Sequence, residues 1–227
     1  MKQTADIVIA GAGVIGMSIA LQLARRSRAR ILVLEKATSA GRGSTGASSA
    51  VCRHKYSHGE MVALARDGIG AYRRWRDFVE LTEPRARFQD VGVLWLGDGR
   101  PEWPARDASR LAALGVRTAV LDDAELSARF PAINPCPGAP DALAADPHRC
   151  GGGGPHLLEL DAGFIDPLDV LADLIDSARE QGVELRFGAE VVGVELQGGR
   201  VAGARLADGS AVACETLISA SGPWCLR

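Results

Sequence analysis

The sequence lacks any block of like charge. Its 26 lysines and arginines stand against 28 acidic residues, which leaves a net charge of −2. A protein that binds nucleic acid through a basic surface, or one that carries an acidic tail, is therefore not expected. A disordered chain is also excluded, because 47% of the residues are hydrophobic and 24% are charged, as in globular proteins. The 227 residues suffice for one large domain or two small ones.

The sequence also lacks a Cys-x-x-Cys pair. Its five cysteines are widely spaced and odd in number: Cys52, Cys136, Cys150, Cys214 and Cys225. This usage predicts reduced thiols and a cytoplasmic location rather than a disulfide framework. A loose metal-binding set can be drawn from Cys136, His148, Cys150 and His156. Its spacing, C-x11-H-x-C-x5-H, fits no standard zinc pattern, so no metal is expected.

No uninterrupted apolar run of membrane-spanning length is present. Residues 7–24 carry no charge, but glycines, a serine and a glutamine interrupt them. The stretch is also at the short end for a span. Neither a signal peptide nor a membrane span is therefore predicted.

Aromatic residues are scarce, at 5%, whereas glycine is abundant, at 27 residues. Backbone turns and close approaches are therefore expected to matter. The first forty residues predict a strand–helix–strand unit. Residues 5–10 and 31–34 are apolar runs typical of strands buried on both faces of a parallel sheet. Between them, apolar residues recur at helical spacing up to the basic cluster at 25–30, which suits a helix C-terminus.

The middle of the chain predicts weaker elements. A second helix is expected over residues 60–81. Its predicted apolar face consists of Met61, Leu64, Ala65, Ala71, Tyr72, Trp75, Phe78 and Val79. A strand is expected over 88–96, and weak helix patterns cover 105–114 and 123–130. Residues 131–155 hold six of the eleven prolines and are predicted to form a long loop or a crossing between domains.

The last third of the chain predicts a helix followed by strands. Asp166 and Pro167 are an N-cap and a first-turn proline, and Gly182 ends the helix. The predicted apolar face of this helix is Leu168, Leu171, Leu174, Ile175 and Ala178. Strands are expected at 183–187, 190–196, 200–206, 210–213 and 216–220. Hairpins are expected at 197–199 and 208–209, where the residues accept positive φ.

Residues 11–16 read Gly-Ala-Gly-Val-Ile-Gly, a G-x-G-x-x-G motif. Alone it is a weak signal among 27 glycines. Here it follows a strand and opens a helix, and Glu35 ends the next strand 19 residues after Gly16. Gly11 permits the tight turn, Gly13 lets a pyrophosphate approach the backbone, and Gly16 lets helix and strand pack closely. The helix N-terminus offers N–H groups to phosphates, and Glu35 can accept from ribose hydroxyls. The motif predicts a dinucleotide without distinguishing NAD from FAD.

Three further segments carry a family resemblance. They are residues 43–53 (GSTGASSAVCR), the three-stranded meander at 190–213, and residues 220–224 (ASGPW). With the glycine motif, they resemble the D-amino-acid oxidase superfamily of FAD enzymes, most of all its sarcosine oxidase and dimethylglycine dehydrogenase branch. The resemblance spans nearly the whole chain.

This resemblance implies an α/β fold. We expect a Rossmann-like FAD-binding domain with a parallel sheet and a three-stranded β-meander, plus part of an antiparallel-sheet substrate domain. The FAD-binding domain is expected over 1–84 and 161–227, and the substrate domain over 85–160.

The resemblance also implies which residues bind FAD. Ser44 and Thr45 match the pair that reaches the pyrophosphate, Val51 falls beside the flavin ring, and the backbone of Val191 matches an adenine contact. Without the resemblance, 44–49 reads as a polar loop. The implied set is Gly11, Ala12, Gly13, Val14, Ile15, Gly16, Glu35, Lys36, Ser44, Thr45, Val51, Val191, Ala220 and Gly222. Some relatives tether FAD through a histidine shortly after the Gly-Ser-Thr. Residues 46–48 here are Gly-Ala-Ser, so non-covalent FAD is expected.

Arg53 is the leading substrate-binding candidate. It matches a family arginine that pairs with the substrate carboxylate, and a guanidinium fork suits that role. His54 and Tyr56 are weaker candidates for lining the pocket. The alternatives are a surface arginine in a basic stretch with His54 and Lys55, and ordinary packing for His54 and Tyr56.

The resemblance therefore implies an FAD-dependent oxidoreductase that oxidises the C–N bond of a small carboxylate-bearing amine. An N-methylated glycine or a D-amino acid is the expected type of substrate, with hydride transfer to flavin N5 and with oxygen or a redox partner as electron acceptor. The alternatives are an FAD-dependent 2-hydroxy-acid dehydrogenase and a catalytically silent FAD-binding fragment. No residue is identified as catalytic. We also expect an N-terminal portion that does not turn over by itself, because no helix follows the predicted strand at 216–220.

Overall fold

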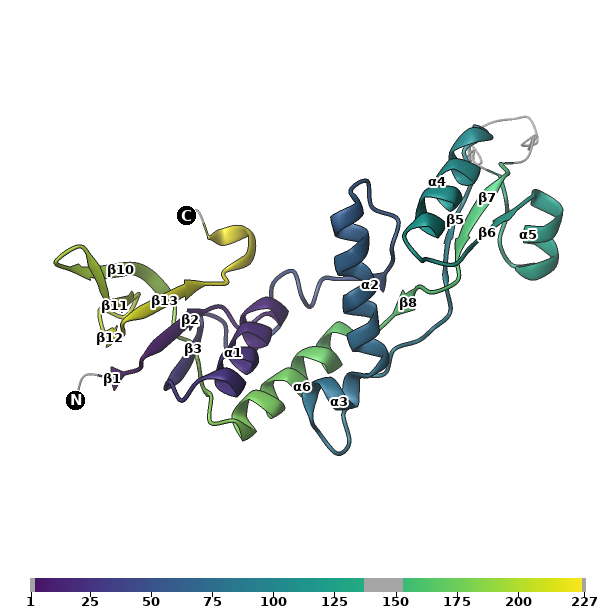
Figure 1. Cartoon of the computed structure of the whole chain (residues 1–227). Helices are drawn as coiled ribbons and strands as arrows, with labels where there is room; N and C mark the ends of the chain where they lie inside the picture. Colours follow the sequence, from purple (N-terminus) through teal and green to yellow (C-terminus); the bar gives the residue numbers. More distant parts are fainter. Residues whose placement is uncertain (1–2, 137–152, 226–227) are drawn as a thin grey trace, which may run out of the picture. The chain divides into compact units, whose positions relative to one another are not determined.

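The structure is a computed structural model that describes residues 3–136 and 153–225 (Figure 1). Contacts divide the chain into two units. The first comprises Met1–Ala50, Arg74–Arg87 and Asp166–Arg227, and the second comprises Val51–Arg73 and Phe88–Ile165. This division differs from the predicted one mainly at 51–73, which group with the second unit. Most of the predicted loop at 131–155 lies outside the described residues, as do His148 and Cys150.

The first unit is built on a parallel sheet in the order β13-β2-β3-β9. Its strands are β2 (Ile7–Ala10), β3 (Ile31–Glu35), β9 (Glu184–Phe187) and β13 (Thr216–Ser219). In the middle of the sheet, Val8 pairs with Leu32 on one side and with Leu217 on the other. Consecutive residues of β2 and β3 are buried, as expected for strands covered on both faces. The α/β fold with a parallel sheet is thereby confirmed.

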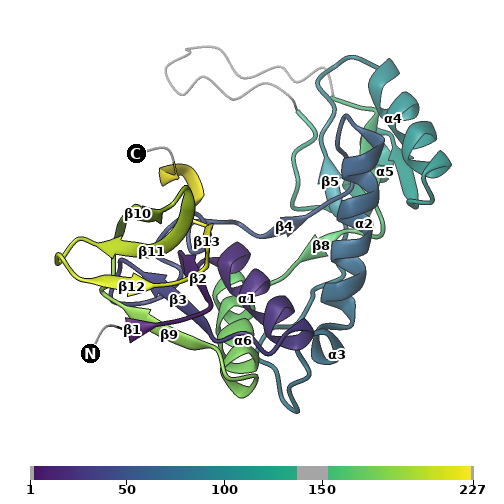
Figure 2. The same ribbon diagram turned by 60° about the vertical axis from the view of Figure 1, so that its left-hand side comes forward.

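Two helices of the first unit, α1 (Val14–Arg26) and α6 (Pro167–Glu180), pack against each other. Figure 2 shows them side by side. As predicted, the Asp166 side chain caps α6, accepting hydrogen bonds from the amides of Leu168 and Asp169 at 2.8 and 2.9 Å. The predicted apolar face of α6 was wrong at Leu168, which is exposed, whereas Val170 is buried.

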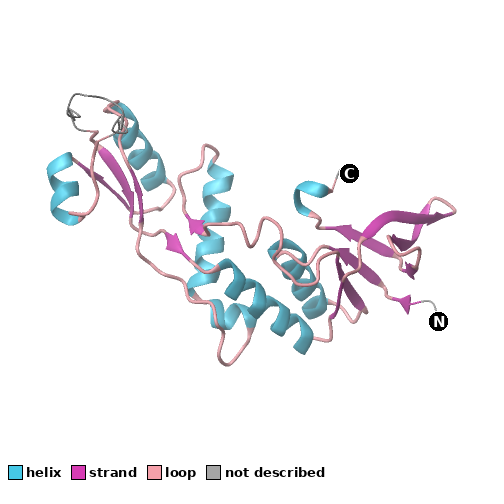
Figure 3. Ribbon diagram, turned by 180° about the vertical axis from the view of Figure 1, so that it is seen from behind, coloured by secondary structure: helices cyan, strands magenta, loops and turns pink. Residues whose placement is uncertain are grey.

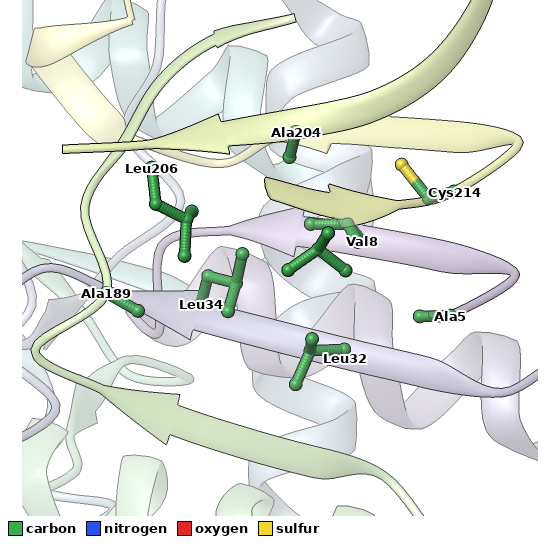
Figure 4. Packing of buried hydrophobic residues seen from close by; sticks show 9 residues of the cluster. Ala5, Val8, Leu32, Leu34, Ala189, Ala204, Leu206 and Cys214 are labelled. Atoms are coloured by element: carbon green, nitrogen blue, oxygen red, sulfur yellow. The ribbon is translucent and has the colours of Figure 1, made fainter. Parts of the chain in front are cut away.

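The meander is an antiparallel sheet formed by β10 (Val191–Gln197), β11 (Arg200–Leu206) and β12 (Ala211–Ala213). Both glycines of the first hairpin have positive φ, +58° at Gly198 and +76° at Gly199, as the turn chemistry predicts. The short strand β1 (Gln3–Thr4) adds to β12 in parallel and was not predicted. Figure 4 shows the core that joins the meander to the parallel sheet. Its buried residues are Ala5, Val8, Leu32, Leu34, Ala189, Ala204, Leu206, Val212 and Cys214.

The second unit contains a small antiparallel sheet in the order β5-β7-β6. Its strands are β5 (Val93–Trp95), β6 (Thr118–Leu121) and β7 (His156–Glu159). The predicted strand at 88–96 is shorter than expected, and β6 and β7 were not predicted. Helices α4 (Glu102–Ala113) and α5 (Asp123–Arg129) confirm the two weak helix patterns (Figure 3). A two-residue pairing joins β4 (Val51–Cys52) to β8 (Gly163–Phe164).

The single helix predicted over 60–81 is two helices, α2 (Gly59–Arg73) and α3 (Trp75–Val79). They meet at Arg74, whose φ of −111° and ψ of +38° are not helical. The predicted apolar face was wrong in α2, where Met61 and Leu64 are exposed and Val62 is buried. Val62 belongs to a core cluster of the second unit, whereas α3 packs on α6 in the first. One periodicity therefore cannot describe both helices.

No helix within 3–136 or 153–225 combines the length and the apolarity needed to cross a bilayer. Over the same residues, no group of three or more His, Cys, Asp or Glu side chains is arranged to hold a metal ion.

Candidate functional site

The glycine turn between β2 and α1 is tightly closed. Gly11 has a φ of +109°, and a Cβ added there would lie 2.5 Å from the carbonyl oxygen of Ala220. A Cβ at Gly16 would lie 1.9 Å from the carbonyl oxygen of Gly11. Neither position can therefore carry a side chain without moving backbone atoms. Ala220 follows β13, and its amide donates to the carbonyl of Ala10 at 2.8 Å.

The N-terminus of α1 lacks an N-cap side chain of its own. Its N-cap residue is Gly13, with extended backbone and no side-chain cap. The Thr45 hydroxyl accepts a hydrogen bond from the amide of Val14 at 3.1 Å. A Cβ built at Gly13 would lie 3.2 Å from that hydroxyl oxygen. Backbone amides and a hydroxyl thus converge where a phosphate can approach, and Ser44 beside them is exposed.

Glu35 stands at the end of β3, beside the glycine turn. Its two carboxylate oxygens accept hydrogen bonds from the backbone, Oε2 from Ala12 at 2.8 Å and Oε1 from Ala37 at 2.9 Å. Because a carboxylate oxygen has two lone pairs, each can accept a further hydrogen bond. The side chain is only half-buried, so a ribose hydroxyl can reach it. The turn, the helix N-terminus and Glu35 together fit the ribose and pyrophosphate of a dinucleotide.

The remaining predicted cofactor residues are less closely grouped. Lys36 is exposed, with its Nζ 4.8 Å from the centre of the Trp224 ring. Gly222 has a φ of +61° and begins the short helix η1 (Gly222–Trp224). Val191 pairs with Leu206 and packs against the core between the sheets. Ile15 is exposed. The structure thus brings residues 11–16 together with Glu35, Thr45 and Ala220, whereas Val51 lies in the second unit.

The predicted substrate residues lie in the second unit, directly after β4. The Arg53 guanidinium lies 4.3 Å from the centre of the Tyr56 ring and 5.1 Å from that of Trp95. Both distances are within the range of cation–π attraction. Arg53 also donates a hydrogen bond to the carbonyl oxygen of Lys55. It is half-buried, unlike the side chain of an ordinary surface arginine, and His54 is 1% exposed.

Glu159 of β7 is a candidate site residue that the sequence did not indicate. It is fully buried and accepts hydrogen bonds from the amide of His54 at 2.5 Å and from the indole of Trp95 at 2.7 Å. Nothing in its tetrapeptide, His-Leu-Leu-Glu, marks it, because an acid at the end of an apolar strand normally faces solvent. Its hydrogen-bond donors, His54 and Trp95, lie 105 and 64 residues away in the chain.

His156, from the loose metal set, has a structural role. The amide of Gly97 donates to Nδ1 at 2.8 Å, so Nε2 carries the proton and donates to Asp123 Oδ1 at 2.8 Å. Asp123 also accepts from the amides of Gly153 and Gly154. Burial alone would raise the pKa of Asp123, but these hydrogen bonds outweigh burial and lower it. Both ring nitrogens of His156 are engaged within the protein, which leaves neither for a metal.

Comparison with known proteins identifies relatives over almost the entire chain. The model of the FAD dependent oxidoreductase family (DAO) matches residues 6–226. Hydrogen cyanide synthase subunit HcnC of Pseudomonas aeruginosa is 28% identical over 99% of this chain, and that of Pseudomonas protegens is 24% identical over 96%. The chain spans 59% and 58% of the length of these two proteins.

Solved structures with the same fold are also about twice as long. L-Proline dehydrogenase from P. horikoshii has a TM-score of 0.77 at 19% identity, covering 99% of this chain and 54% of its own. Glycine oxidase from Bacillus cereus scores 0.79 at 18% identity, covering 97% and 56%. NikD, described as an unusual amino acid oxidase of nikkomycin biosynthesis, scores 0.74 at 24% identity, covering 98% and 52%. At these identities the likeness is one of fold.

Proposed function

The chain belongs to the FAD dependent oxidoreductase family, and from this premise we propose that it oxidises the C–N bond of a small amine that also carries a carboxylate. The proposed substrate is an N-methylated glycine or a D-amino acid, as in the sarcosine oxidase and dimethylglycine dehydrogenase branch. The electron acceptor is oxygen or a redox partner. The amino-acid oxidase and dehydrogenase names of the structural neighbours are consistent with this substrate class.

The cofactor of the family is FAD, and residues of the first unit fit it. The amides at the start of α1 and the Thr45 hydroxyl would hold the pyrophosphate, and Glu35 would accept from the ribose. We propose that the FAD is held without a covalent bond. When bound, FAD supplies at flavin N5 an acceptor for the hydride that leaves the substrate carbon.

The proposed substrate class depends on the placement of the Arg53 guanidinium against Tyr56 and Trp95. A guanidinium held against two aromatic rings keeps its planar fork in one orientation, and such a fork pairs with a carboxylate through two parallel hydrogen bonds. Arg53 would thus bind the substrate by its carboxylate and leave the amine carbon free to react. Holding the substrate in one register is the main contribution that a protein makes to such a transfer.

The test is anaerobic reduction of the FAD-loaded protein. Sarcosine, N,N-dimethylglycine and D-alanine are mixed with it in turn, beside D-lactate as a hydroxy acid, and loss of the oxidised-flavin absorbance is followed. Reduction by one of the amines supports the proposal. Reduction by D-lactate alone identifies a 2-hydroxy-acid dehydrogenase, and bound FAD that none of them reduces is the result expected of a catalytically silent FAD-binding fragment. Because two relatives are named hydrogen cyanide synthase subunits, cyanide release is assayed in the same mixtures.

A further inference from the structure

A buried carboxylate in the second unit holds the segment that carries Arg53. Glu159 Oε2 accepts from the His54 amide at 2.5 Å and lies 3.3 Å from His54 Nδ1. Glu159 Oε1 accepts from the Trp95 indole at 2.7 Å and from the Lys55 amide at 3.2 Å. The four partners come from three residues on two elements, so one side chain ties β5 to the segment that follows β4.

The charge of Glu159 is compensated within the protein. A buried carboxylate is costly unless hydrogen bonds satisfy it, and here both oxygens are satisfied. Burial alone would raise the pKa of Glu159, but the hydrogen bonds from His54, Trp95 and Lys55 together lower it. An ionised carboxylate only accepts, so His54 Nδ1 carries the proton that faces it. Glu159 therefore acts as a fixed anion that orders its donors.

Among the described residues, each contact that restrains the Arg53 side chain involves Glu159, one of its hydrogen-bond donors or a residue next to one of them. The guanidinium lies beside the Trp95 ring, whose indole nitrogen Glu159 holds. It donates to the carbonyl of Lys55, whose amide Glu159 holds. Its other aromatic neighbour, Tyr56, follows Lys55 directly and donates its amide to the His54 carbonyl at 2.7 Å. Releasing Glu159 would therefore loosen both rings and the carbonyl at once.

We propose that Glu159 is a positioning residue: by fixing His54, Lys55 and Trp95, it holds the guanidinium fork of Arg53 in the orientation that receives a carboxylate. That the ligand of Arg53 is a carboxylate rests on the proposed function, whereas the effect of Glu159 on the orientation of Arg53 does not. The substitution to examine is Glu159→Gln, which keeps the size of the side chain but removes the charge and turns one acceptor into a donor.

The experiment observes Arg53 directly. Protons above an aromatic ring resonate at shifted positions, so the Nε–H signal of Arg53 in a ¹⁵N–¹H NMR spectrum reports its place against Tyr56 and Trp95. Arg53→Lys assigns the signal by removing it. We expect Glu159→Gln to move this signal toward that of exposed arginines. An Arg53 signal that stays in place in a folded Glu159→Gln protein overturns the proposal.

A matched control separates positioning from general destabilisation. Asp173 in the first unit is also fully buried, and its carboxylate accepts from the Trp75 indole and from the amides of Arg85 and Ala86, each at 2.9 Å. Asp173→Asn thus breaks a comparable cluster, and the Arg53 signal should not move. If Glu159→Gln does not fold, the Arg53 signal is measured in Glu159→Asp instead. It keeps the charge but withdraws the oxygens by about 1.5 Å, so the Arg53 signal must shift partway, and an unmoved signal again overturns the proposal.

Acetate tests the carboxylate part. In the FAD-loaded wild-type protein, acetate should shift the Arg53 signal with saturation, and Glu159→Gln should weaken that binding by about tenfold while FAD affinity is unchanged. If acetate moves nothing in the wild type but Glu159→Gln still moves Arg53, the carboxylate role in the proposed function fails and the positioning role stands. If acetate binds equally to both proteins, the positioning role fails and the proposed function stands.

Discussion

Adding one methyl group at Gly16 should destabilise the protein severely. The new Cβ would lie 1.9 Å from the carbonyl oxygen of Gly11 and 3.3 Å from the Cβ of Ala220. A relaxed carbon–oxygen contact is about 3.3 Å, so the two groups must separate by about 1.4 Å. The obstructing oxygen belongs to the backbone, and no side chain can rotate away. Overpacking of this kind costs about 1–3 kcal/mol and more when rigid groups must move, so Gly16→Ala should lose about 3 kcal/mol.

The same substitution elsewhere in the chain should have the opposite sign. Gly68 lies inside α2, and a Cβ there would meet no atom of the described residues within 4 Å apart from its chain neighbours and the backbone of its own helix. Because alanine is the better helix former, Gly68→Ala should stabilise the protein by about 0.5–1 kcal/mol. Gly13→Ala is the third member of the series. Its Cβ would approach the Thr45 hydroxyl at 3.2 Å and would stand where the pyrophosphate is expected.

Two measurements distinguish the three variants: the free energy of unfolding from urea titrations, and the affinity for FAD. We expect a large loss of stability for Gly16→Ala, a small gain for Gly68→Ala, and near-native stability for Gly13→Ala with FAD binding weakened by about tenfold or more. A Gly16→Ala protein as stable as wild type would refute the close packing of the turn. Unchanged FAD affinity in Gly13→Ala would refute its place beside the cofactor.

Three further predictions concern charged groups. In a complete, active form of the protein, Arg53→Lys keeps the charge but loses the fork, so carboxylate binding should weaken by about 1–3 kcal/mol, more than FAD binding does. An unaltered KM for every acidic substrate would identify an ordinary surface charge. Glu35→Gln places an NH2 group against the amide of Ala12 or Ala37, and FAD affinity measured by flavin fluorescence should fall about tenfold; equal affinities would contradict the ribose contact. The pKa of Glu159 is lowered in the folded protein, so on acidification the unfolded chain binds a proton at this carboxylate before the folded protein does. The ionised carboxylate therefore stabilises the fold above pH 4.5, the ordinary pKa of a glutamate. This stabilisation is lost as the pH falls through the pKa of the folded protein. Urea titrations over this range should show a shallower pH dependence in Glu159→Gln, and identical slopes would contradict the ionised state.

Elements with strict local demands were predictable from the sequence. The glycine turn, the cap at Asp166 and the hairpin at Gly198 each need particular residues over a few positions, so their structures follow from short segments. The predictions of an α/β fold and of membership of the FAD-dependent family also rested on short segments, and both are confirmed.

Elements that depend on distant partners were not predictable. Strands β6 and β7 have four residues each, too few for a distinctive period, and their pairing joins segments far apart in the chain. The apolar face assigned to 60–81 combined residues that pack in two different units. Glu159 is the clearest case in the site, because its burial and its four hydrogen-bond partners exist only after folding.

We propose that the first unit binds FAD through residues 11–16 and Glu35 without a covalent bond. The direct measurement is to load the purified chain with FAD, remove free cofactor, denature the protein with acid, and record the absorbance of supernatant and precipitate. We predict a flavin spectrum in the loaded protein and all of the colour in the supernatant. Failure to take up flavin, or tight binding of NAD in its place, would contradict the claim, and yellow colour remaining in the precipitate would contradict its non-covalent part.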